Sequence, residues 1–130
     1  MKEFAAAEWQ RARRTLGSGQ QLISSDPDSA ASRAYYAAFH AVTCLFALRG
    51  QSFSKHSAVR AALHRELIRS GEWPAELGQA YDLLLDLRET ADYGGMSRVS
   101  AADARNAVQK AAAILDAVRR AHPELPQGDE

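Results

Sequence analysis

The chain has 130 residues, of which 46% are hydrophobic and 25% charged, and its 16 Lys and Arg are balanced by 16 Asp and Glu. This length predicts one domain that buries a core unaided. The zero net charge argues against a protein that coats nucleic acid through bulk positive charge and leaves a local basic patch open. A single cysteine excludes an internal disulfide and a cysteine-based zinc site. No apolar run approaches the roughly 20 residues of a membrane span, and the first residues lack a signal-peptide core. We therefore expect a cytoplasmic protein without membrane contact.

Helical periodicity is present in five segments, and none alternates with the period of two typical of a strand. Residues 2–23 carry small and apolar side chains at steps of four and three (Ala5, Trp9, Ala12, Leu16, Gly19 and Ile23). Residues 29–49 are apolar over most of the helix surface, which predicts the central helix of the fold, and Gly50 ends it. We further expect the first or the fourth helix to carry exposed apolar residues, such as Trp9 or Trp73, which a partner can cover.

Three further helices follow in chain order. Residues 55–69 form a helix that Ser54 is expected to cap, and residues 74–93 form one that begins near Pro74 and stops at a Gly-Gly pair. The fifth begins after Ser100, which with Asp103 resembles a capping box. The pattern predicts an all-α fold, an antiparallel up-and-down bundle of four to five helices over residues 1–122. Residues 123–130 are expected to form a frayed polar tail.

Charge is unevenly distributed along the chain. Residues 55–69 hold four basic side chains and one acid, whereas residues 72–92 hold six acids and one arginine. Either each helix has a solvated face, or the two surfaces pair across a helix contact or a dimer interface.

Three polar clusters interrupt the apolar pattern. The first lies on the apolar second helix, where Ser32, Tyr36 and His40 share one stripe, flanked by Arg33. These side chains either fix the packing through hydrogen bonds or form a site, because an unpaired buried polar group costs about 1–3 kcal/mol.

The second cluster is the entrance to the third helix, where Lys55 and His56 add positive charge to a helix N-terminus that also carries serines. A phosphate can bind at such a place, but a capping serine beside basic residues is also common. The third cluster ends the fourth helix. Arg88 falls on its core stripe with Asp92 four residues later and Tyr93 next to it. That arginine either forms a structural pair with Asp92 or binds a phosphate.

Metal and thiol chemistry find no support in the sequence. The four histidines do not form a metal-ligand spacing with carboxylates, and Cys44 lies among apolar neighbours that predict an inert buried thiol. We expect no metal and no cofactor.

The segments SRAYYAAFHA (32–41), FSKHS (53–57) and LRETADYG (87–94) together resemble the HEPN family, named for higher eukaryotes and prokaryotes nucleotide-binding. The resemblance covers nearly the whole chain. It implies a helical bundle that forms a homodimer with a cleft between subunits. Many members of the family are metal-independent ribonucleases, and some are toxins whose antitoxin is a small nucleotidyltransferase. Others bind nucleotides or serve as assembly modules.

The ribonuclease motif of that family is Arg-x4-6-His, and this sequence matches it only in part. Arg88 matches the arginine and Glu89 the polar residue after it, but the positions of the histidine hold Tyr93, Gly94 and Gly95. Some toxins are adenylylated on a tyrosine two residues beyond the histidine, and that position is also Gly95. The chain thus resembles a branch with Arg-x3-Asp-Tyr-Gly.

Three hypotheses follow: a nucleotide- or RNA-binding module that works with a nucleotidyltransferase, an active ribonuclease toxin with an altered motif, or a structural helical dimer. If the chain cleaves RNA, Arg88 is the cation, and His40, or alternatively His56, is the base, since imidazoles act near neutral pH. The residues expected to bind nucleotide or RNA are Arg33, Tyr36, Lys55, His56, Asp92 and Tyr93.

Overall fold

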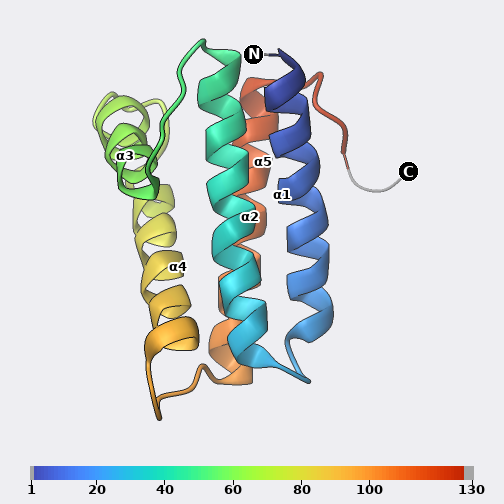
Figure 1. Cartoon of the computed structure of the whole chain (residues 1–130). Coiled ribbons are helices and arrows are strands. Elements are labelled where there is room, and N and C mark those ends of the chain that lie inside the picture. Colours follow the sequence, from blue (N-terminus) through green and yellow to red (C-terminus); the bar gives the residue numbers. More distant parts are fainter. Residues whose placement is uncertain (1, 128–130) are drawn as a thin grey trace.

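The computed structural model describes residues 2–127, which form helices and no strands (Figure 1). The all-α prediction is therefore confirmed. The elements are α1 (Lys2–Leu22), α2 (Pro27–Leu48), α3 (His56–Ala62), the π-helical η1 (Leu63–Ile68), α4 (Ala75–Tyr93) and α5 (Ala101–Ala121).

The central element is α2, which contacts α1, α3, α4 and α5. Figure 1 shows α1, α2, α4 and α5 running alternately down and up, with α3 beside the start of α4. Many of the buried residues of α2 are alanines, whose small side chains let neighbouring helices approach closely. The sequence thus predicted both the up-and-down bundle and its central helix.

Local signals explain most helix ends. Asp26 caps α2 by accepting a hydrogen bond from the Ser29 amide at 3.2 Å, and Ser100 caps α5 by accepting from the Asp103 amide at 3.0 Å. Gly50 follows α2 with a left-handed φ of 78°. The expected Ser54 cap is wrong, because Lys55 occupies the N-cap position of α3 and its side chain makes no capping bond.

Residues 55–69 were expected to form one α-helix, but the chain widens into the π-helical η1 after Ala62. The wider turn lies against Gly78 of α4, where an added Cβ would lie 3.0 Å from Cε1 of His64 and 3.1 Å from Cγ1 of Ile68. The absence of a side chain at position 78 therefore allows this close packing.

The basic and acidic segments pair within the chain. Nε of Arg60 lies 2.7 Å and Nε2 of His64 lies 3.0 Å from the same oxygen of Asp82. Burial raises the pKa of Asp82, but the hydrogen bonds from Arg60 and His64 outweigh it and hold that pKa below its ordinary value. For these side chains, the basic segment therefore pairs with the acidic segment across a helix contact, as one of the two interpretations of the sequence predicted.

The first and fourth helices do carry exposed large apolar residues, Phe4 on α1 and Tyr93 on α4, but the two tryptophans expected there, Trp9 and Trp73, are buried. Trp9 lies on the apolar stripe of α1, and its indole Nε1 donates to the carbonyl of Pro126 at 2.8 Å. Leu125 is buried as well, so the chain after α5 folds back on the bundle up to residue 127 and is not frayed there. The rest of the predicted tail, residues 128–130, lies outside the described residues.

Candidate functional site

Arg88 is held where α4 meets α2. Its side chain is 18% exposed, its Nη2 donates to the Tyr36 hydroxyl at 2.8 Å, and its Nε lies 3.2 Å from Oδ2 of Asp92. The carbon of the guanidinium lies 5.3–5.4 Å from the ring centres of Tyr35, Tyr36 and Tyr93. The structural pair of Arg88 with Asp92, one of the two interpretations of the sequence, is therefore present, and Arg88 is also bonded to Tyr36 on the polar stripe of α2.

The guanidinium makes one side-chain hydrogen bond to the described residues, from Nη2 to Tyr36, and its side chain is 18% exposed. Its Nε–H is buried and has no acceptor there at a bonding angle, although the Asp92 oxygen is near. Burial lowers the pKa of Arg88, but the oxygens of Tyr36, Tyr93 and Asp92 raise it by a larger amount. The pKa of Arg88 therefore lies above its ordinary value. Arg88 is therefore a permanent cation whose position is set by aromatic rings.

His56, at the first position of α3, completes an aromatic cluster around that cation. Its ring stacks on Phe39 with centres 4.0 Å apart, and its Nδ1 lies 3.3 Å from the Tyr35 hydroxyl. Burial, Arg88 and His40 all lower the pKa of His56 from its ordinary 6.5. His56 therefore favours its neutral form more than a free imidazole does.

His40 is tied to α1 by a buried carboxylate. Its Nδ1 lies 3.1 Å from Oε1 of Glu8, which is 4% exposed and is the one buried charged residue of the described chain. The other oxygen of Glu8 lies 3.3 Å from Nη1 of Arg11. Glu8 was not among the residues that the sequence indicated. The available signal was an acid within the apolar stripe of α1, next to Trp9 and one turn from Ala5 and Ala12.

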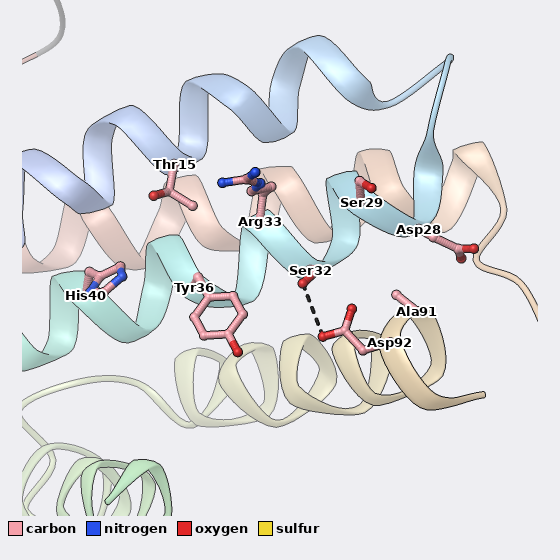
Figure 2. Close-up of a pocket in the computed structure, with 9 residues that line it drawn as sticks. All are labelled: Thr15, Asp28, Ser29, Ser32, Arg33, Tyr36, His40, Ala91 and Asp92. Carbon is pink, nitrogen blue, oxygen red and sulfur yellow. Dashed lines mark hydrogen bonds between the residues drawn. The ribbon is translucent and has the colours of Figure 1, made fainter. Parts of the chain in front are cut away.

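An open groove of 410 Å³ lies between α1, α2 and the end of α4. Figure 2 shows its lining, with Tyr36 and His40 one turn apart on α2 and the Tyr36 hydroxyl directed toward α4. The Ser32 hydroxyl donates to Asp92 at 3.4 Å across the groove. The lining residues are Thr15, Asp28, Ser29, Ser32, Arg33, Tyr36, His40, Ala91 and Asp92.

The predicted site residues are only partly brought together. Tyr36, Asp92 and Tyr93 all lie against Arg88. The ring of His40 lies 6.4 Å and that of His56 6.0 Å from the Tyr36 ring, centre to centre. These two histidines therefore flank the Tyr36 ring. Within the described residues, the hydroxyl of Tyr36 is bonded to Arg88 and to neither histidine.

Two predicted residues stand apart from the Arg88 contacts. Arg33 is exposed on the groove wall, and in Figure 2 its side chain extends toward α1. Lys55 is exposed at the N-cap of α3 and makes none of the contacts described above. If these two cations act on a ligand, they do so at the rim of the site.

The arrangement suits an anionic ligand with a planar ring. A guanidinium binds phosphate oxygens, and exposed aromatic faces stack on bases. Within residues 2–127, no three His, Cys, Asp or Glu side chains gather as a metal site requires. In the same part of the chain, no helix is both long enough and apolar enough to cross a membrane.

Comparison with known proteins identifies the class of this chain. Residues 6–121 match the HEPN domain family, so the match covers most of the sequence, and the chain belongs to that family. A "UPF0332 protein" of Thermotoga maritima is 36% identical over 126 residues, which are 95% of this chain and 96% of the relative.

Two further proteins are similar. The "Putative toxin MJ0142" of Methanocaldococcus jannaschii is 27% identical over 112 residues, or 85% of this chain and 76% of that protein. The crystal structure of TT1696 from Thermus thermophilus superposes with a TM-score of 0.76 at 24% identity, covering 89% of this chain and 96% of that one. The latter likeness supports the helical fold.

Proposed function

We propose that this HEPN protein binds a nucleotide or single-stranded RNA around Arg88, as the dimeric component of a cytoplasmic toxin–antitoxin-like system whose partner is a small nucleotidyltransferase. The observation that carries the proposal is the cation itself: Arg88 is held by Tyr36 and Asp92 and faces three tyrosine rings beside an open groove. A phosphate on Arg88 with a base on an aromatic face is a common mode of single-strand recognition.

The dimer and the partner rest on the family resemblance and on one surface feature. Tyr93, one of the rings that contact Arg88, is 73% exposed, and Met96, three residues later in the chain, is 97% exposed. An apolar surface next to a site suits coverage by a second subunit. The toxin-like role is supported by the similarity to the Methanocaldococcus jannaschii protein, which is named as a toxin.

A second candidate, a ribonuclease with an altered motif, is favoured by His40, which lines the groove one turn from Tyr36. Cleavage through the 2′-hydroxyl needs a base for that hydroxyl and a cation for the phosphate. No histidine occupies the motif position after Arg88, and a positioned general base contributes about 10²–10⁴-fold. We expect turnover to be absent or far below that of members with the complete motif.

One assay separates the candidates: purified protein is incubated with a mixed RNA pool without added metal, and both binding and cleavage are followed. Binding without cleavage that is lost in Arg88→Ala supports the proposal. Robust cleavage that both Arg88→Ala and His40→Ala abolish identifies a ribonuclease instead. If the protein neither binds nor cleaves RNA, the hypothesis of a structural dimer is the one that remains. The dimer itself is contradicted if sedimentation shows a monomer at micromolar concentration.

A further inference from the structure

Glu8 is placed unusually for a glutamate. It lies on the buried face of α1, and its two carboxylate oxygens face different partners, Nδ1 of His40 at 3.1 Å and Nη1 of Arg11 at 3.3 Å. A buried carboxylate accepts hydrogen bonds and does not donate them when ionised. Facing an ionised Glu8, a neutral His40 therefore carries its proton on Nδ1, because the carboxylate oxygen 3.1 Å away can only accept.

We infer that Glu8 is a positioning residue, which fixes His40 so that its unprotonated Nε2 accepts a hydrogen bond from a ribose 2′-hydroxyl in the groove. The inference rests on the proposed function and names the chemical group of the ligand that the site recognises. His40 lines the groove together with Tyr36, while Glu8 approaches from the opposite helix. An Nδ1 bond to a carboxylate leaves only the second ring nitrogen for a ligand.

The 2′-hydroxyl is the group that fits this acceptor. A phosphodiester of the RNA strand has no proton to donate to a lone pair, and Arg88 already offers the cation for it. The groups that surround His40 are Glu8 from α1, Tyr36 from α2 and, farther away, His56 from α3. Because the 2′-hydroxyl distinguishes RNA from DNA, His40 would give the site a preference for ribonucleotides.

The experiment compares a single-stranded RNA with a 2′-fluoro strand of the same sequence, which keeps the ribose-like sugar pucker but lacks the donor hydrogen. At about pH 8, where ordinary imidazoles are neutral, the parent should bind RNA about threefold to tenfold more tightly than the fluoro strand, the usual worth of one hydrogen bond. Glu8→Leu should remove most of that ratio with little change in binding of the fluoro strand. Glu3→Leu, an exposed position on the same helix, should retain it.

Two readouts separate positioning from a merely structural pair. Nitrogen-15 NMR of the imidazole should show the parent's His40 protonated on Nδ1, and the opposite tautomer would overturn the inference. In a double-mutant cycle, Glu8→Leu should add nothing to the RNA preference already lost in His40→Ala, because Glu8 acts through His40. If Glu8→Leu does not fold, the inference is still tested by the tautomer of His40 in the parent and by the RNA preference of His40→Ala.

The outcomes also distinguish this inference from the proposed function. An RNA-to-fluoro ratio that survives His40→Ala overturns the inference while RNA binding itself stands. If neither strand binds, the proposed function fails together with the role of the 2′-hydroxyl, and the tautomer alone decides whether Glu8 positions His40.

Discussion

Replacing Arg88 by alanine tests how strongly the site is built into the fold. The change removes the hydrogen bond to Tyr36 at 2.8 Å, the ion pair with Asp92 at 3.2 Å and contacts over three aromatic rings. A hydrogen bond to a charged group is worth about 1.5–3 kcal/mol, and an exposed ion pair about 0–1 kcal/mol. The side chains of Arg88 and Asp92 are 18% and 30% exposed, so water relieves part of the loss. We expect the free energy of unfolding to fall by about 2 kcal/mol.

The assay is thermal unfolding followed by circular dichroism. For a domain of this size, a loss of about 2 kcal/mol lowers Tm by roughly 5–10 °C. Arg105→Ala, which removes an exposed arginine from α5, serves as the matched control and should leave Tm nearly unchanged.

A double-mutant cycle isolates the bond between the two helices. Tyr36→Phe removes only the accepting hydroxyl, so the two substitutions should show a coupling of about 1 kcal/mol. An Arg88→Ala variant that melts within about a degree of the parent, or a coupling below about 0.3 kcal/mol, refutes the description of Arg88 as a structural link between α2 and α4.

Three other expectations follow from the packing and the charges. Gly78→Ala should destabilise the protein by about 1–3 kcal/mol in denaturant unfolding, because its Cβ would lie 3.0 Å from His64, whereas Gly17→Ala, with open space around it, should stabilise it slightly. Burial raises the pKa of Cys44 to about 12, so native protein should react with thiol reagents far more slowly than unfolded protein. The pKa of Asp82 in the folded protein lies below its ordinary 3.8. The stability that Asp82 contributes is therefore complete above pH 3.8 and is lost as the pH falls through the lowered pKa. Asp82→Asn should flatten the acid limb of a pH–stability curve.

The bundle followed from the sequence because its signals are local. The stripe of α1, the apolar surface of α2 and the caps at Asp26 and Ser100 each act within a few residues. The π-helical turn was not predictable in this way, because it lies against Gly78, ten residues beyond the end of η1.

Most residues of the candidate site were predicted from the sequence, but the carboxylate that contacts His40 was not. Arg88 and Asp92 are one turn apart on α4, so their pairing is visible in the spacing, and the polar stripe of α2 indicated Tyr36 and His40. Glu8 was missed because its contact with His40 joins positions 32 residues apart on different helices. The burial of Trp9 was missed although it lies on the apolar stripe of α1, and the chain near Pro126, to which its indole donates, was marked by composition as a polar tail.

The most direct test of ligand binding at Arg88 is the salt dependence of single-stranded RNA binding, measured for the parent and for Arg88→Gln. Each phosphate neutralised on a single strand contributes about 0.7 to the slope of log K against log salt concentration. We expect the parent to bind with a clear salt dependence, and Arg88→Gln to bind more weakly with a slope shallower by about 0.7. Arg105→Gln should match the parent. An Arg88→Gln variant with the parent's affinity and slope would contradict the assignment of Arg88 as the phosphate-binding cation.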